Sequence, residues 1–495
     1  MSPAAAESEI KAERDVLGSA DAGPAAVRGG ALRVLGFAAA SLLALGSGAL
    51  LYRHLGAVNT GRYTSAVQLV ALVAGVSDLG LTAIGMRELS IRRGEERVQT
   101  ARALLGLRLV VTGIGVIAVA LFAAIAYGLT LAIGVLLAGA GLVFQVWQGT
   151  LAIPLMTDLR FGWTSLFEVA RQLLTSILIV ALVLSGAGLL AFLATPIPSA
   201  VAVLAVMIAI FRRQLPMGVR FDTGAWRALL KPVASYALAV AASALYFRIA
   251  LLIVSLVSDG HQLGYFSVSF NIVAALFSIP ALLVTSAFPI FSRAARDDHE
   301  RLAYAIERVF EVSLLVGAWV SLAIALGARF AIELVGGSAF SAAVPVLAIQ
   351  GISVGATFVG TVWGFGMLSL GRHRTILVFN FCALAAIAVT VGIMASVDGA
   401  RGAAIGASAV EVAAAAVGAI VLTHGRSHLR PSARVIPKVL VALLLASAPA
   451  LIPIAEPARV ALSGAIYLLV LALLGTFPSE LRALVPLPRR DGRRP

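Results

Sequence analysis

Several charged side chains lie inside long apolar segments of this 495-residue sequence. The most relevant to chemistry are Arg108, Arg171, Arg248, Asp78 and Glu411. An ionised side chain at the centre of a bilayer costs about 2.5–3.5 kcal/mol on insertion scales. Each of these residues therefore needs an opposite charge, a hydrated cavity or a nearby interface, and each is a candidate for function.

Arg248 is the most deeply placed of these arginines, about fifteen residues into an apolar segment and preceded by Tyr246 and Phe247. A guanidinium binds phosphate oxygens in a bidentate manner, so Arg248 could hold a pyrophosphate group in a central cavity, with Tyr246 beside it. The alternative is a structural ion pair or a hydrogen bond to a helix carbonyl. The depth of Arg248 favours the cavity role.

Arg108 and Arg171 lie about one turn from the ends of their apolar segments. Either side chain could extend to phosphate groups of the inner leaflet, or could line the cavity. Glu168 precedes Arg171 by three residues, which places both side chains on one helix face and allows Glu168 to neutralise Arg171.

The carboxylates of Asp78 and Glu411 could be protonatable coupling sites, or could be held neutral by apolar surroundings without a role in transport. For Asp78, the glycine at position 80 equally suggests a packing and hinge function. Asn271 and Gln145 could donate hydrogen bonds to sugar hydroxyls, although such residues more often hold helices together.

The segments that carry these residues are predicted to span a membrane. Hydrophobic residues make up 60% of the chain and charged residues only 13%, against about 45–50% and about 25% in soluble proteins. This composition excludes an ordinary soluble enzyme, and the single cysteine, Cys382, excludes a disulfide scaffold.

Fourteen apolar runs are long enough to cross a bilayer, since a spanning helix needs roughly 20 residues. They cover approximately residues 34–52, 64–86, 104–127, 129–151, 168–188, 189–211, 233–257, 264–290, 305–328, 342–369, 375–397, 402–424, 439–455 and 460–477. The even number predicts that both termini lie on the same side of the membrane.

The distribution of positive charge predicts that this side is the cytoplasm. With the N-terminus inside, 29 of the 38 Lys and Arg residues lie in inner connections and tails, and only 5 lie in outer connections. Inner loops hold such an excess in membrane proteins. The net charge of +14 therefore indicates topology and attraction to anionic membrane lipids, and disfavours nucleic-acid binding.

The loops are too short to contain a soluble catalytic domain. The sequence has no phosphate-binding glycine loop with lysine and no metal-ligand cluster of His and Cys, so we predict neither an enzyme nor a cofactor. A membrane glycosyltransferase or polymerase is disfavoured because it usually needs a sizeable outer loop. Transport is the leading class.

An internal repeat relates the second and eighth runs. Residues 61–70 resemble residues 264–273 at an offset of 203, and both open an apolar run after a short turn. The chain is therefore predicted to be an all-α polytopic protein with two parallel six-helix lobes and a terminal helix pair. The predicted parts are a mobile cytoplasmic tail (1–30), an N-lobe (31–211), a linker with an interfacial amphipathic helix (212–232), a C-lobe (233–424), the final pair (425–477) and a basic cytoplasmic tail (478–495).

Prolines interrupt two of the predicted helices. Pro196 and Pro198 lie in the sixth run and Pro280 in the eighth, and each removes a backbone donor. They could be flexing points of a transporter or static kinks.

Several segments together resemble a known transporter family. They are residues 55–63, 77–81, 86–89, 226–231, 264–266 and 289–293, with Arg248 and Pro280. Over roughly residues 30–430 the chain is similar to the polysaccharide transporters that flip undecaprenyl-linked O-antigen-type oligosaccharides. These belong to the multidrug/oligosaccharidyl-lipid/polysaccharide flippase (MOP) superfamily. The chain departs from the family at Ala250, two positions after Arg248, where many relatives carry an acidic residue.

The resemblance implies a flippase in the bacterial cytoplasmic membrane that moves a polyprenyl-pyrophosphate-linked oligosaccharide by alternating access. Its partners would be that substrate, membrane lipids, and a polysaccharide polymerase with glycosyltransferases. The alternatives are a peptidoglycan lipid-precursor flippase or a cation-coupled multidrug exporter of the same superfamily. A cationic cavity disfavours cationic drugs because like charges repel.

Overall fold

The computed structural model describes residues 22–78, 80–158, 160–212, 218–230, 234–277, 279–280, 284, 291, 294–295, 299–426 and 429–476, and all regular elements in these ranges are helices. Residues 22–30, which the sequence places in the N-terminal tail, begin the first of these helices. Residues 1–21 and the predicted tail at 478–495 lie outside the described residues. So do residues 79, 231, 289–290 and 292–293, which belong to the segments that carry the family resemblance.

The chain forms two compact units, Met1–Leu252 and Ile253–Pro495, here called unit 1 and unit 2. Unit 1 contains α2 (Ala22–Asp78), α3 (Leu81–Ile91), α4 (Gly94–Tyr127), α5 (Leu129–Thr157), α6 (Phe161–Leu184), α7 (Leu189–Ala194), α8 (Pro196–Phe211), α9 (Thr223–Leu230) and most of α10 (Ala234–Val257). Unit 2 contains α11 (Gly260–Leu276), α13 (His299–Leu326), α14 (Ala328–Val335), η3 (Ser338–Ala343), α15 (Val344–Ser369), α16 (His373–Thr423), α17 (Val435–Ala446), η5 (Ala448–Leu451) and α18 (Glu456–Leu473).

The predicted all-α polytopic fold with about fourteen spans is confirmed. Nine helices of the described ranges are long and apolar enough to cross a membrane. Two of them hold two predicted spans each, separated by backbone breaks at Gly56 (φ 68°) in α2 and at Gly399 (φ 50°) in α16. The span predicted at 64–86 extends beyond α2, which ends at Asp78, into α3. Helix α10 matches the predicted span 233–257, and the shorter helices α11 and α17 overlap the described parts of the two remaining spans.

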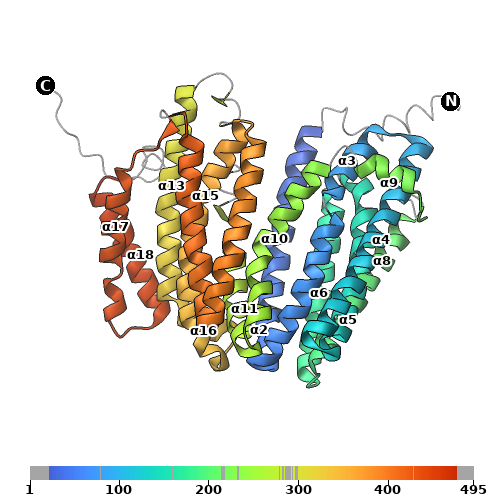
Figure 1. Ribbon diagram of the computed structural model, residues 1–495, viewed down its shortest axis with the longest axis horizontal. Coiled ribbons are helices and arrows are strands. Elements are labelled where there is room, and N and C mark those ends of the chain that lie inside the picture. The colour runs from blue at the N-terminus through green and yellow to red at the C-terminus, as the bar shows by residue number, and fades with distance from the viewer. Residues whose placement is uncertain are drawn as a thin grey trace. The chain divides into compact units, whose positions relative to one another are not determined.

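Unit 1 is packed through small residues that let helices approach closely. Its helix α5 packs against α4 and α8 (Figure 1). A Cβ atom at Gly139 would overlap Val116 of α4, and one at Gly141 would overlap Pro196, the first residue of α8. Such contacts replace the hydrophobic effect as the source of cohesion between helices in lipid.

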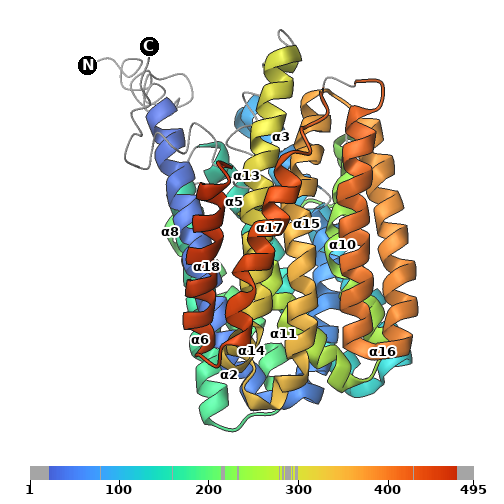
Figure 2. The same ribbon diagram turned by 90° about the vertical axis from the view of Figure 1, so that its left-hand side faces the viewer.

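In unit 2, helices α13 and α15 also approach closely through small residues. A Cβ atom at Gly317 would approach Phe358 of α15, and the hydroxyl of Ser321 donates to the carbonyl of Gly351 at 2.8 Å. The final pair, α17 and α18, packs on α13 (Figure 2). There the buried Tyr467 hydroxyl donates to the carbonyl of Leu315 at 2.9 Å, so the aromatic ring is anchored at its polar end.

The segment before α9 and α9 itself are bound to α4 by backbone and side-chain contacts. The N–H of Arg220 donates to the carbonyl of Arg102 at 3.1 Å, and the indole N–H of Trp226 donates to the carbonyl of Ala103 at 2.9 Å. A Cβ atom at Gly106 would collide with the carbonyl oxygen of Arg220. This glycine is therefore required for the close approach of the segment to α4.

We expect Gly106→Ala to lower the thermal stability of unit 1, because the added methyl displaces the Arg220 backbone. Overpacking of this kind costs about 1–3 kcal/mol. Gly113→Ala on the same helix is the matched control, since nothing lies within 4 Å of its Cβ position and alanine is the better helix former. Thermal unfolding of both variants in detergent measures the difference. Equal stability of the two variants would contradict the close approach.

The carboxylate of Asp222 caps the first turn of α9. It accepts a hydrogen bond from the backbone N–H of Ala225 at 3.0 Å, and it forms an ion pair with Arg220 at 2.7 Å. The Ala225 hydrogen bond and the Arg220 charge lower the pKa of the Asp222 carboxyl. The cap is thus strongest when Asp222 is ionised.

The stability of α9 should therefore fall in acid. A carboxyl whose pKa is lowered by folding contributes its full stabilisation above its unfolded pKa of about 3.9 and loses it as the pH falls through the folded value. Hydrogen exchange of the Ala225 amide across this pH range measures the loss. Asp222→Asn keeps an acceptor oxygen without the charge, so its protection should not vary with pH. A pH-independent wild type would disprove the cap's electrostatic contribution.

Candidate functional site

Arg248 binds a neutral partner inside unit 1. Its Nη1 donates to Oε1 of Gln68 at 2.7 Å, which joins α10 to the second half of α2. Gln68 is only 8% exposed, and Arg248 is half-buried. The hydrogen bond therefore satisfies a buried amide oxygen and orients the guanidinium, but it adds no negative charge.

The sequence explains why Gln68 reaches α10. The second half of α2 is almost wholly apolar around this position, and its neighbours Ala66, Leu69 and Val70 belong to the core of unit 1. Apolar packing on these residues holds the helix in place. Gln68 is therefore a polar side chain on a rigid element, which suits it to position a cation.

Arg108 forms an ion pair with Asp78. Its Nη2 lies 3.0 Å from Oδ1 of Asp78, and its Nη1 donates to Thr82 at 3.3 Å. The Thr82 hydroxyl also donates to Asp78 at 2.5 Å. The side chain of Arg108 is 7% exposed and that of Asp78 is 39% exposed, so Asp78 is the partly hydrated end of the pair.

A turn between α2 and α3 brings these groups together. Gly80 adopts φ 75°, a left-handed conformation that glycine reaches without strain. This turn places Thr82 at the start of α3, beside Asp78 at the end of α2. The turn at Gly80, for which a packing and hinge function was predicted, and the ion pair of Asp78 are therefore parts of the same local structure.

Arg171 is paired within its own helix. Its guanidinium binds the carboxylate of Glu168 on α6, three residues earlier, and its side chain is 18% exposed. The i,i+3 spacing in the sequence is sufficient for this pair to form.

The remaining candidates lie in separate places. Tyr246 is half-buried on α10, two residues before Arg248, and Gln145 is half-buried on α5. In unit 2 the Asn271 amide donates to the carbonyl of Ser267, one turn earlier, at 2.9 Å. Glu411 accepts a hydrogen bond from Thr357 of α15 at 3.5 Å. These contacts hold side chains in place and leave the proposed transport roles as predictions.

Sequence reasoning missed Gln68 as a site residue. Gln68 and Arg248 are 180 positions apart, too far for local spacing to reveal the contact. One signal was present, because the internal repeat aligns Gln68 with Asn271, a predicted polar contact. Equivalent amides in both repeats would have identified Gln68.

The three candidate arginines differ in the charge of their partners. Arg108 and Arg171 each contact a carboxylate, whereas the structure gives Arg248 an amide and, within the described ranges, no ion pair. The positive charge of Arg248 is consequently not compensated by a described side chain. It can attract an anionic group that enters from outside the protein.

A family model described as "Polysaccharide biosynthesis protein" matches residues 50–345. The chain belongs to this family. The matched residues include Arg248, Gln68, Asp78 and Arg108. No curated protein sequence matches the chain.

Solved structures confirm the fold of the MOP superfamily. A lipid II flippase MurJ in an inward closed conformation has a TM-score of 0.75 at 12% identity, covering 90% of this chain and 98% of its own. An inward-facing MATE-family multidrug resistance transporter has a TM-score of 0.61 at 16% identity, covering 79% and 95%. A MOP superfamily transporter from Pyrococcus furiosus has a TM-score of 0.52 at 16% identity, covering 82% and 96%. The protein is thus a multi-pass membrane protein with a transporter fold.

Loss of the Asp78 charge should destabilise unit 1. Asp78→Asn leaves Arg108 buried beside a neutral amide, and breaking a fully buried pair costs about 3–5 kcal/mol. We expect about 2–3 kcal/mol, because Asp78 is 39% exposed and water screens part of the charge. Asp78→Asn combined with Arg108→Met should recover most of the loss, since no charge then remains unpaired. Denaturation in mixed micelles tests this; a single variant as stable as the wild type would contradict it.

Proposed function

We propose that this protein translocates a polyprenyl-pyrophosphate-linked oligosaccharide across the bacterial cytoplasmic membrane by alternating access, for the synthesis of cell-surface polysaccharide. The family match supports a role in polysaccharide biosynthesis, and the fold supports transport. In this proposal the sugar and pyrophosphate enter a cavity lined by Arg248, while the polyprenyl chain stays in lipid. Both termini face the cytoplasm.

The uncompensated charge of Arg248 carries the proposal. Its guanidinium has five N–H donors, and the contact with Gln68 uses Nη1. The remaining donors can bind phosphate oxygens through charge-assisted hydrogen bonds. Gln68 would fix the orientation of the guanidinium before the substrate arrives, which lowers the entropic cost of binding.

A peptidoglycan lipid-precursor flippase is the second candidate. The similarity to a lipid II flippase over 98% of that protein favours it. A cation-coupled multidrug exporter is disfavoured, because Arg248 would repel a cationic drug. As partners of the proposed flippase, glycosyltransferases would act before the transport step and a polysaccharide polymerase after it.

We expect Arg248→Gln to reduce leaflet transfer of a fluorescent lipid-linked oligosaccharide by about 10- to 100-fold, because it removes charge-assisted hydrogen bonds of about 1.5–3 kcal/mol. Arg248→Lys should retain part of the activity, since the charge remains but the bidentate geometry is lost. Purified protein in proteoliposomes, with a membrane-impermeant quencher, gives the transfer rate.

Arg401→Gln is the control, because Arg401 is 62% exposed in the turn between the halves of α16. Size-exclusion profiles of all variants must match the wild type, so that folding is not the cause of a loss. Full transfer by Arg248→Gln would disprove the role of Arg248. Selective transfer of a peptidoglycan precursor would favour the second candidate, and an increase in substrate mass would indicate a polymerase instead.

A further inference from the structure

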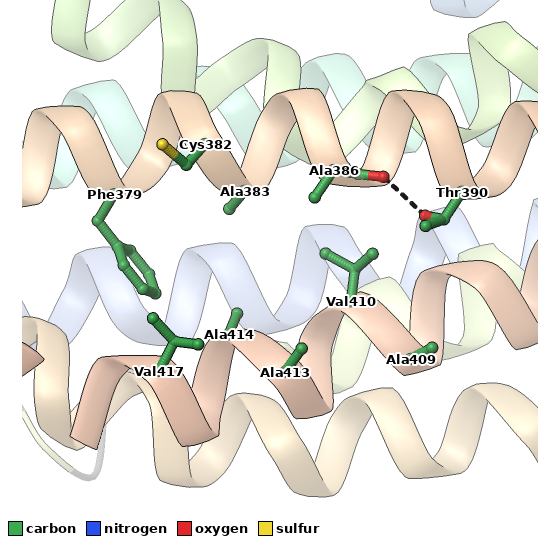
Figure 3. Close-up of a pocket in the computed structure, with 10 residues that line it drawn as sticks. All are labelled: Phe379, Cys382, Ala383, Ala386, Thr390, Ala409, Val410, Ala413, Ala414 and Val417. Carbon is green, nitrogen blue, oxygen red and sulfur yellow. Dashed lines mark hydrogen bonds between the residues drawn. The ribbon is translucent and has the colours of Figure 1, made fainter. Parts of the chain in front are cut away.

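An apolar groove of about 430 Å³ lies between the two halves of α16 in unit 2 (Figure 3). The first half runs from His373 to the break at Asp398–Gly399, and the second runs from there to Thr423. The first half contributes Phe379, Cys382, Ala383, Ala386 and Thr390, and the second contributes Ala409, Val410, Ala413, Ala414 and Val417.

Alanines at facing positions create this groove. Five of the ten lining residues are alanine, and they recur along the facing sides of both helix halves. The larger Phe379 and Val417 side chains lie together near one end (Figure 3). The single hydroxyl in the lining belongs to Thr390, and it donates to the carbonyl of Ala386 at 2.7 Å. The groove therefore offers almost no free polar group, and water would be poorly accommodated in it.

The dimensions of the groove suit a single hydrocarbon chain. About eleven residues separate Phe379 from Thr390, which corresponds to roughly 16 Å along the helix axis at 1.5 Å per residue. This length and the apolar lining match one acyl chain lying parallel to membrane-spanning helices.

Arg372 places a cation beyond the end of the groove that Phe379 and Val417 line, about two helical turns before Phe379. Its Nη1 donates to the carbonyl of Val421 at 2.8 Å and to that of Leu422 at 3.4 Å. Val421 lies one turn beyond Val417, so the guanidinium of Arg372 bridges the beginning of the first half and the end of the second. Within the described part of the chain, Nε and Nη2 of Arg372 have no partner.

The two ends of the groove differ in charge. Exposed His373 and Arg374 follow Arg372 at one end. At the break between the halves, Arg401 is balanced by Asp398 at 3.9 Å. A ligand with an anionic head and an apolar tail thus has one preferred orientation, with the head at Arg372.

We propose that this groove binds an anionic phospholipid, with one acyl chain between the halves of α16 and the phosphate at Arg372. The site is distinct from Arg248, which belongs to unit 1. Binding of the phospholipid depends on shape and charge within unit 2 and does not require the transport function proposed above.

Lipid retention during native mass spectrometry tests the groove. The full chain is extracted from vesicles that contain equal amounts of phosphatidylglycerol and phosphatidylcholine with identical acyl chains. We expect wild-type protein to retain phosphatidylglycerol preferentially. Ala386→Leu with Ala413→Leu should abolish this retention by filling the groove, whereas Ala385→Leu with Ala416→Leu should leave it unchanged, because these alanines lie outside the lining.

The same measurement tests the charge at the end of the groove. Arg372→Gln should lower the preference for phosphatidylglycerol about fivefold, as expected for one cation near an anionic lipid at about 1 kcal/mol. Arg401→Gln at the opposite end should not change it. Equal retention of both lipids by the wild type, or retention that survives the filled groove, would overturn the proposal.

A second measurement leaves the sequence unchanged. Cys382 is the single cysteine of the chain, is exposed and lines the groove. Nanodiscs that contain phosphatidylglycerol should slow maleimide labelling of Cys382 relative to phosphatidylcholine alone. Equal labelling rates would contradict occupancy by the anionic lipid. Protection by added polyprenyl phosphate that exceeds protection by phosphatidylglycerol would show that the groove prefers a different lipid.

Discussion

A guanidinium among membrane-spanning helices must find an oxygen atom, and the kind of oxygen it finds divides the arginines of this protein into two groups. Arg108 and Arg171 bind carboxylates and thereby become neutral pairs. Arg248 binds an amide, and Arg372 binds helix carbonyls. Amides and carbonyls satisfy hydrogen bonds without cancelling the charge, so these two cations remain attractive to an anion that the protein itself does not supply.

The sequence was most informative where the determining interaction is local. Hydropathy over about 20 residues predicts a span because the bilayer sets a minimum length, and each of the fourteen predicted spans overlaps a helix in the residues that the structure describes. The pair of Glu168 and Arg171 follows from helical spacing alone. The pair of Asp78 and Arg108 does not, because it joins two helices through residues 30 positions apart and depends on the turn at Gly80.

Close approaches between chain segments were hidden for a related reason. Whether a glycine is required depends on what passes in front of its missing Cβ atom, and nothing local to Gly106 indicates that the Arg220 carbonyl does so. Gly113 on the same helix faces open space, although both glycines have the same helical surroundings in sequence. The sequence likewise did not predict the groove between the facing alanines of α16, because a small residue can mark either a tight helix contact or a groove.

In the proposed transport, a cation that binds phosphate must keep its charge, whereas a group that couples transport to protons must gain and lose a proton. Arginine stays protonated in proteins, so Arg248 can hold a phosphate but cannot report a proton gradient. The position that could have supplied a carboxylate on the same helix is Ala250, which is buried at 4% exposure. Asp78 and Glu411 are the candidate coupling carboxylates, and the described contacts of Asp78 are with Arg108 and Thr82, whereas Arg248 contacts Gln68. If Asp78 couples transport to an ion, the coupling charge and the substrate charge belong to different contacts of unit 1, and movement of the helices that carry them would link the two.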